Sequence, residues 1–148
     1  MIGPSRVLRA SLSGRDGSDL GVLTHALVST HAPLLATVPL NQLLPRMNGL
    51  ARSLLDANWN RRRVLAAEAV SLAHKYVTRL APAGPWRLLG VEYETGDGVV
   101  DLAWEHGEDG QVLFDELKTS RLATNKGSLT RFSGHVRFVD HAAVRAAV

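Results

Sequence analysis

Three consecutive pieces of sequence decide the fold: VVDLAWEH at residues 99–106, GEDG at 107–110 and QVLFDELK at 111–118. The outer pieces are rich in valine, leucine and aromatic residues, which favour extended strands. The central piece ends in Asp-Gly, a pair suited to the positive φ angles that tight hairpin turns require. Together they predict a β-hairpin over residues 99–118.

A third strand and a helical segment come before this hairpin. Residues 86–94 are predicted as a strand, joined to the hairpin by a second turn, TGDG, at 95–98. Residues 48–80 instead have apolar residues at helical spacing, with a break near Asn58 to Asn60. Because short turns join antiparallel strands and a sheet face needs a covering layer, this order predicts an α/β fold: a three-stranded antiparallel meander flanked by helices.

The two ends of the chain have weaker patterns. Residues 1–21 show no sustained period and are expected to form a loop or loosely packed leader. Residues 22–44 are more apolar but contain two prolines, so we expect a short helix or strand and then a helical start near Leu40. Residues 119–148 leave room for a short C-terminal helix or strand, with a strand-like run at 136–139.

Composition excludes several classes of protein. The chain has 148 residues, the size of one ordinary domain, and no cysteine. The lack of cysteine excludes disulfide scaffolds, thiolate metal sites and cysteine nucleophiles. Apolar runs are too interrupted to cross a membrane or to form a secretory signal. We therefore expect a soluble, cytoplasmic protein with no membrane partner.

Charge is unevenly distributed, although the net charge is only +3. Residues 1–63 carry 8 basic and 3 acidic groups (+5), residues 64–118 carry 4 and 10 (−6), and residues 119–148 carry 5 and 1 (+4). An acidic centre between basic flanks suits carboxylates that bind a metal ion and are approached by a polyanion. Ordinary solvated surface charge is the alternative interpretation.

Three side chains of the hairpin carry the candidate chemistry. Alternate residues of a strand share a face, so Glu116 and Lys118 are neighbours at the end of the second strand. Asp101 lies among apolar residues of the first strand, where an unpartnered carboxylate is costly to bury. Pairing of the two strands can bring Asp101 to Glu116 and Lys118. The alternatives are a structural ion pair between Glu116 and Lys118, and an Asp101 that caps its strand or pairs with an arginine.

The predicted helix adds an acid and three bases. Glu68 lies in its apolar stripe, where it either needs a cation or reaches solvent past its alanine neighbours. Asn60 is suited to cap this helix, with Arg61, Arg62 and Arg63 in the first turn. Basic groups at a helix N-terminus oppose the helix dipole. These arginines therefore either contact phosphates or are simply solvated.

The six histidines, His25 among them, have no mutual spacing that would make a histidine metal site, and we expect most of them to be structural. There is also no Gly-x-Ser-x-Gly elbow and no glycine-rich loop between a strand and a helix. We therefore expect no organic cofactor.

Taken together, the acidic residues and the lysine resemble the PD-(D/E)xK nuclease superfamily. The likeness rests on a helical Glu68, then Asp101 in VVDLA, and Glu116 and Lys118 in FDELKT of the next strand. It is closest to the RecB-type and phage-exonuclease branch and covers about residues 60–120. The proline that names the motif is absent before Asp101, and no Gln-x-x-x-Tyr segment follows Lys118. The resemblance implies a restriction-endonuclease-like core.

The resemblance also implies a divalent metal site. Glu68, Asp101, Glu116 and the backbone carbonyl of Leu117 would be metal ligands. Asp101, Glu116 and Lys118 would be catalytic, with Lys118 beside the attacking water. Carboxylate oxygens suit Mg²⁺ or Mn²⁺, which lower the pKa of bound water. We therefore expect a Mg²⁺-dependent deoxyribonuclease.

Under this interpretation residues 1–47 form a leader and helical segment and residues 48–148 the nuclease-like domain, in one globular unit. DNA is the expected partner, while RNA, and a homodimer or larger nuclease assembly, stay open. The basic residues expected to contact nucleic acid are Arg61, Arg62, Arg63, Lys126 and Arg131. The alternative function is a catalytically inactive nucleic-acid-binding or assembly module on the same fold. A third reading is a structural protein in which the Glu-x-Lys pair is only an ion pair.

Overall fold

The computed structural model describes residues 12–96, 98–118 and 135–140, with the backbone alone at 118 and 135–140. Its helices and strands have the following bounds: α2 Asp16–His31, α3 Leu43–Leu55, α4 Arg63–Lys75, β1 Trp86–Thr95, β2 Gly98–His106, β3 Val112–Lys118 and β4 His135–Asp140. Short helical turns join them: η1 Ala32–Ala36, η2 Leu40–Gln42, η3 Asp56–Asn58 and the π-helical η4 Tyr76–Leu80. None of the helices in the described part is both long and apolar enough to cross a membrane.

The sheet has the order β1-β2-β3-β4. The first three strands form the predicted antiparallel meander, with a bulge in β1 between Leu88 and Gly90. The short C-terminal helix or strand left open by the sequence is a strand, β4, which pairs parallel to β3, from Leu113 opposite His135 to Lys118 opposite Asp140. The chain that connects β3 to β4, residues 119–134, lies outside the described residues. The prediction of an α/β fold built on a meander is confirmed.

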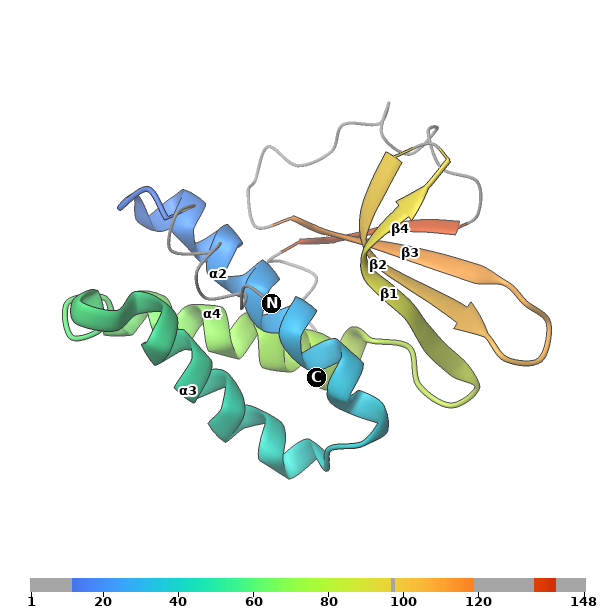
Figure 1. Ribbon diagram of the computed structural model, residues 1–148, viewed down its shortest axis with the longest axis horizontal. Coiled ribbons are helices and arrows are strands. Elements are labelled where there is room, and N and C mark those ends of the chain that lie inside the picture. Colours follow the sequence, from blue (N-terminus) through green and yellow to red (C-terminus); the bar gives the residue numbers. More distant parts are fainter. Residues whose placement is uncertain (1–11, 97, 119–134, 141–148) are drawn as a thin grey trace.

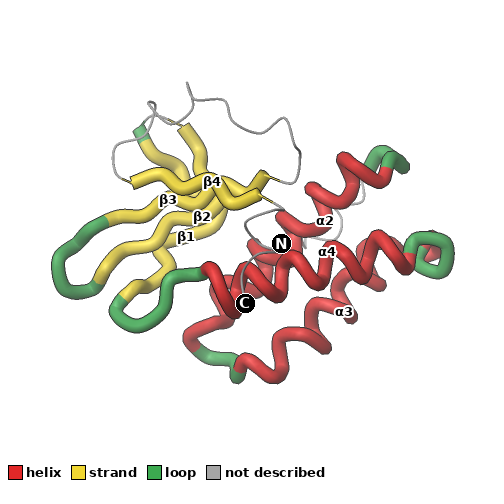
Figure 2. Tube along the Cα trace, turned by 180° about the vertical axis from the view of Figure 1, so that it is seen from behind, coloured by secondary structure: helices red, strands yellow, loops and turns green. Residues whose placement is uncertain are grey.

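Helices and sheet form two sides of the molecule, as Figures 1 and 2 show. The main core joins buried side chains of all three helices to Leu102 and Trp104 of β2 and Leu113 of β3. Ala103 and Phe114, which alternate with these residues, belong to a smaller second cluster. Alternation along β2 and β3 thus buries one face of the sheet under the helices.

The helical stripe predicted upstream of the sheet is the buried face of α4. Leu65, Leu72 and Tyr76 are 6%, 3% and 1% exposed. Asn60 does not cap this helix: α4 begins at Arg63, and the Asn60 side chain instead accepts a hydrogen bond from Arg63 Nη2 at 2.7 Å. Arg61 therefore precedes the helix, and so does Arg62.

The N-terminal segment also differs from the sequence prediction. Residues 16–21 are helical and belong to α2, where a loop was expected. Asp19 in the first turn is fully buried and accepts hydrogen bonds from the backbone N–H groups of Ser13 (2.7 Å) and Gly14 (2.8 Å). Arg62 Nη1 lies 2.8 Å from the same carboxylate. The helix start is thus held by a tertiary ion pair that local sequence patterns do not contain.

Candidate metal centre

The hairpin register brings Asp101 and Glu116 together. Backbone pairing of β2 and β3 extends to Leu102 opposite Asp115, so Asp101 and Glu116 come next on the two strands. Here side chains continue the hydrogen bonding between the strands. The Asp101 N–H donates to Glu116 Oε1 at 3.1 Å, and the Leu117 N–H donates to Asp101 Oδ2 at 2.7 Å. Two of the predicted site carboxylates are therefore directly adjacent.

A histidine from the helical side completes this cluster. His25 lies on α2, and its Nε2 is 2.9 Å from Asp101 Oδ1 and 2.8 Å from Glu92 Oε1. The side chains of His25 and Asp101 are 30% and 20% exposed, whereas Glu92 is 57% exposed and forms the rim. The ligand atoms of these three residues all lie within 4.8 Å of one another. We call His25, Glu92, Asp101 and Glu116 the acidic–histidine cluster.

The position of Glu92 depends on an unusual backbone conformation. Val91 pairs with Leu102 and Tyr93 with Val100, so Glu92 lies opposite Asp101 between these pairs. Its φ angle is 48°, in the left-handed region that residues other than glycine seldom adopt. Such strain is often found at functional sites, where surrounding structure holds it in place. Here it accompanies a carboxylate that reaches the ring of a histidine.

Electrostatics favour a cation at this cluster. Burial alone would lower the pKa of His25, but the hydrogen bond that its ring N–H donates to Asp101, and the charges of Asp101, Glu92 and Glu116, raise it above its ordinary value. Three carboxylates and one imidazolium together carry a formal charge of −2. A divalent ion that binds the imidazole nitrogen would take the place of this proton.

The donor atoms fit a divalent metal ion. Carboxylate oxygens suit Mg²⁺ and Mn²⁺, and an imidazole nitrogen adds affinity for later transition metals. The mixed set therefore suits Mn²⁺ better than Mg²⁺. The Nε2 atom of His25 faces the carboxylates and is the atom that would bind the ion.

Glu68 occupies a different place from the other predicted ligands. It is half-buried on α4 and lines a hollow of about 280 Å³ with Asp16, Leu20, Arg61 and Arg62. Among the residues that the structure describes, it is not in the group of ligand atoms around His25. The structure thus gathers Asp101 with two residues that the sequence did not single out, His25 and Glu92, while Glu116 joins them by accepting the Asp101 N–H.

The remaining predicted site residues are placed as follows. Lys118 is the last residue of β3, two positions after Glu116. Arg61 donates to the Asn58 side chain, and Arg63 to Asn60. Arg62 lies 2.8 Å from both Asp16 and Asp19 and joins α4 to α2. Lys126 and Arg131 lie outside the described residues.

His25 and Glu92 were missed for different reasons. The spacing of the histidines relative to one another carries no signal for His25, because its partners are acids that are distant in sequence. Its position between the buried Leu23 and Leu27 of an apolar helix was the available signal. No signal in the sequence points to Glu92, because its left-handed backbone and its approach to α2 arise only in the folded sheet.

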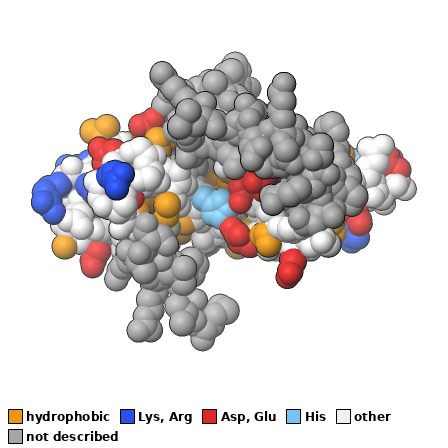
Figure 3. Space-filling model, turned by 90° about the horizontal axis from the view of Figure 1, so that it is seen from above, with side chains coloured by type: hydrophobic (Ala, Val, Ile, Leu, Met, Phe, Trp, Pro, Cys, Tyr) orange, Lys and Arg blue, Asp and Glu red, His pale blue; other side chains and the backbone are white. Residues whose placement is uncertain are grey.

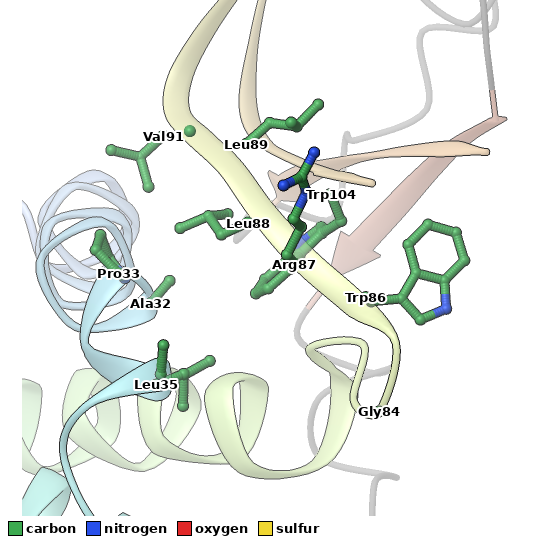
Figure 4. A pocket seen from close by; sticks show the side chains of 12 residues that line it. Ala32, Pro33, Leu35, Gly84, Trp86, Arg87, Leu88, Leu89, Val91 and Trp104 are labelled. Carbon is green, nitrogen blue, oxygen red and sulfur yellow. The ribbon is translucent and has the colours of Figure 1, made fainter. Parts of the chain in front are cut away.

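A larger hollow of about 670 Å³ lies away from these ligands, between η1 and β1. Figure 4 shows Leu88 and Val91 of β1 pointing toward Ala32 and Pro33 of η1. The one charged residue among its described lining residues, Arg87, is paired with Glu105 on the neighbouring strand. Its walls are mainly apolar, so the chemistry of this molecule is better sought at the acidic–histidine cluster.

Comparison of the chain with protein-family models, with curated proteins and with solved structures gave no match.

Proposed function

We propose that the protein is a metal-dependent nuclease that hydrolyses phosphodiester bonds, most simply in DNA. The single observation that carries this proposal is the chain of contacts from three elements: Glu116 Oε1 accepts the Asp101 N–H at 3.1 Å, and His25 Nε2 lies 2.9 Å from the Asp101 carboxylate. Two of these were expected as ligands from the PD-(D/E)xK resemblance alone. The third was not, and it supplies an additional donor of the right kind.

The strand order is compatible with the restriction-endonuclease-like core that we propose. That core places its acidic motif on neighbouring strands and is completed after the motif by a helix and another strand. In this chain the carboxylates lie on β2 and β3, and β4 follows as a fourth strand beside β3. His25 reaches Asp101 from α2, one of the helices that pack against the sheet.

In this mechanism Asp101, Glu116 and His25 would hold the metal ion, the Leu117 carbonyl would be a further ligand, and Glu92 would lie at the rim. The bound ion would lower the pKa of a water molecule and stabilise charge on the scissile phosphate. Lys118 orients the attacking water or neutralises the phosphate. Glu68 as an accessory ligand stays a prediction.

The test is cleavage of plasmid and linear DNA by the purified chain with Mn²⁺ or Mg²⁺. Asp101→Asn, Glu116→Gln and Lys118→Ala should each lower the rate about a hundredfold or more, because several kcal/mol of transition-state stabilisation would be lost. Glu108→Gln, in the exposed turn at the far end of the same hairpin, is the matched control and should keep full activity. Circular dichroism establishes that each variant is folded.

Unchanged cleavage in both Asp101→Asn and Glu116→Gln would refute the proposal. A calorimetric titration with Mn²⁺ distinguishes the nuclease from the alternative function. A titration that shows no Mn²⁺ site, or one unaffected by Glu116→Ala, together with DNA binding and no cleavage, would favour an inactive nucleic-acid-binding or assembly module.

A further inference from the structure

A second group of charged side chains lies where α3 ends and α4 begins. The guanidinium carbons of Arg52 and Arg63 lie 4.4 Å and 4.5 Å from the centre of the Trp59 ring. Arg61 stands beside them in the turn before α4. All three arginines are exposed. We call Arg52, Trp59, Arg61 and Arg63 the arginine–tryptophan tip.

The tip arginines differ from the neighbouring Arg62 in the groups that they contact. Arg62 is 15% exposed and lies 2.8 Å from two carboxylates, those of Asp16 and Asp19. The tip arginines are instead arranged by neutral groups, since Arg61 and Arg63 donate to asparagine side chains. The three tip arginines and the one acid of residues 52–63, Asp56, give a formal charge of +2. This surface is therefore a concentrated positive patch.

The geometry of the tip suits phosphate groups. A guanidinium that stacks on an aromatic ring uses its face and keeps N–H groups at its edge for an anion. Those edges match the paired oxygens of a phosphate, and an arginine has five N–H donors, of which a single asparagine uses one. Two guanidinium groups already lie over the Trp59 ring. Trp59 therefore arranges the arginines and is not a platform for a nucleic-acid base.

The tip is connected to the acidic–histidine cluster by α2. Arg62, within the tip segment, is paired with Asp16 in the first turn of α2, and His25 lies nine residues further along that helix. Nine residues of α-helix rise by about 14 Å, which is roughly four base pairs of duplex. Figure 3 shows Lys and Arg side chains at the helical end of one face and a histidine among acidic side chains near its middle. A nucleic-acid chain that runs along α2 from its Asp16 end would therefore pass from the tip segment to the cluster.

We propose that the arginine–tryptophan tip binds the phosphate backbone of the nucleic acid whose scissile bond lies at the acidic–histidine cluster. The second half of this statement rests on the proposed nuclease function, whereas the first half does not. The contact is independent of base sequence, because arginine edges recognise phosphates and the indole is occupied. It explains how a cluster rich in carboxylates can be approached by a polyanion: the attraction is supplied at the tip.

The test measures DNA binding in EDTA, so that metal and cleavage play no part. A fluorescent 30-base-pair duplex is titrated with the full chain at several salt concentrations. Arg52→Gln/Arg63→Gln should weaken binding about tenfold or more at 0.1 M salt and reduce the slope of log K against log salt by about two, because two phosphate contacts are lost. Binding of single-stranded RNA through the same arginines would also support the proposal, because RNA has the same phosphate groups.

The matched control is Arg79→Gln, compared with Arg63→Gln. Both remove one exposed arginine, but Arg79 lies in η4, at the opposite end of the helix that Arg63 begins. Arg63→Gln should lower the salt slope by about one, and Arg79→Gln should leave it unchanged. Circular dichroism and Mn²⁺ binding, which depend on the fold and on the acidic–histidine cluster, should be the same in all variants.

Any one of three results would overturn the proposal: no binding of duplex by the wild-type chain at low salt, wild-type affinity and salt slope in the double variant, or a loss of binding in Arg79→Gln as large as that in Arg63→Gln. Binding of phosphatidylserine vesicles through the tip, with no binding of DNA, would likewise refute it. The two proposals can be refuted separately. DNA binding through the tip without cleavage would refute the proposed nuclease function alone. Cleavage that is unaffected by substitution of the tip arginines would refute the proposed role of the tip alone.

Discussion

At the scale of single residues, the candidate site depends on one nitrogen atom. His25 Nε2 lies within 3 Å of two carboxylates from different strands, and one of these carboxylates also accepts the Leu117 N–H. This arrangement ties the imidazole to both Asp101 and Glu92 before any ligand binds. Of these residues, Glu92 has the strained backbone, because its φ angle is 48°.

The strain at Glu92 leads to a prediction about stability. Glycine adopts positive φ without steric cost, so Glu92→Gly should leave the free energy of unfolding unchanged or raise it by up to about 1 kcal/mol. Glu94→Gly in the same strand, where φ is not positive, should lower it by about 0.5–1 kcal/mol. Urea denaturation measures both. An equal loss in the two variants would show that Glu92 is not strained.

At the scale of elements, α2 is held to α4 by Arg62. The guanidinium spans the exposed Asp16 and the fully buried Asp19, whose side chains are 81% and 0% exposed. Burial would raise the pKa of Asp19, but hydrogen bonds from Ser13, Gly14 and Arg62 together lower it. This connection matters for function, because α2 carries His25 and its first turn meets the arginine–tryptophan tip.

The two acids paired with Arg62 should differ in their contribution to stability. Asp19→Asn should lower the free energy of unfolding by about 3 kcal/mol, because the half-buried guanidinium of Arg62 would lose its fully buried partner. Asp16→Asn should lower it by less than about 1 kcal/mol, since its carboxylate is exposed. Urea unfolding at pH 7 measures the difference.

The pH dependence of this effect has a definite sign. The folded pKa of Asp19 is below its model-peptide value of 3.8, so the carboxylate stabilises the fold above pH 3.8 and loses that contribution as the pH falls below it. The difference in the free energy of unfolding between wild type and Asp19→Asn should therefore become smaller in acid. A difference that is absent at pH 7, or equal losses for Asp16 and Asp19, would contradict the role of the buried pair.

At the scale of the whole molecule, the acidic–histidine cluster lies where the helical side meets the sheet. His25 comes from a helix, and Glu92, Asp101 and Glu116 come from three successive strands. A ligand bound by all of them would therefore hold the two sides together. Ligand binding to the folded state alone stabilises that state by mass action.

Metal addition should consequently raise the melting temperature. With Mn²⁺ at a hundred times its dissociation constant the gain is about 2.7 kcal/mol, which corresponds to roughly 5–11 °C for a chain of this size. EDTA should reverse the shift, and His25→Gln and Asp101→Asn should reduce or abolish it, while Glu108→Gln should keep it. Differential scanning fluorimetry is sufficient. A shift that is the same in all four proteins would place the ion elsewhere.

Much of this architecture follows from local sequence. Strand composition, two Asp-Gly turns and period-two alternation are properties of neighbouring residues, and they predict the meander and its α/β class. The same alternation predicts that Asp101 can reach Glu116, since a hairpin register depends on its turn and on its buried face. Side-chain periodicity likewise predicts the buried stripe of α4.

Tertiary structure alone decided the rest. His25 joins Asp101 across 76 positions of sequence, and Arg62 holds the start of α2 across 46 positions to Asp16. The left-handed backbone of Glu92 follows from the packing around it, because nothing in its own side chain favours that conformation. Such contacts join residues that are distant in the chain, and no local pattern encodes their distances. The sequence by itself therefore determined the hairpin and its two carboxylates, and the folded molecule decided which histidine and which third acid complete the site.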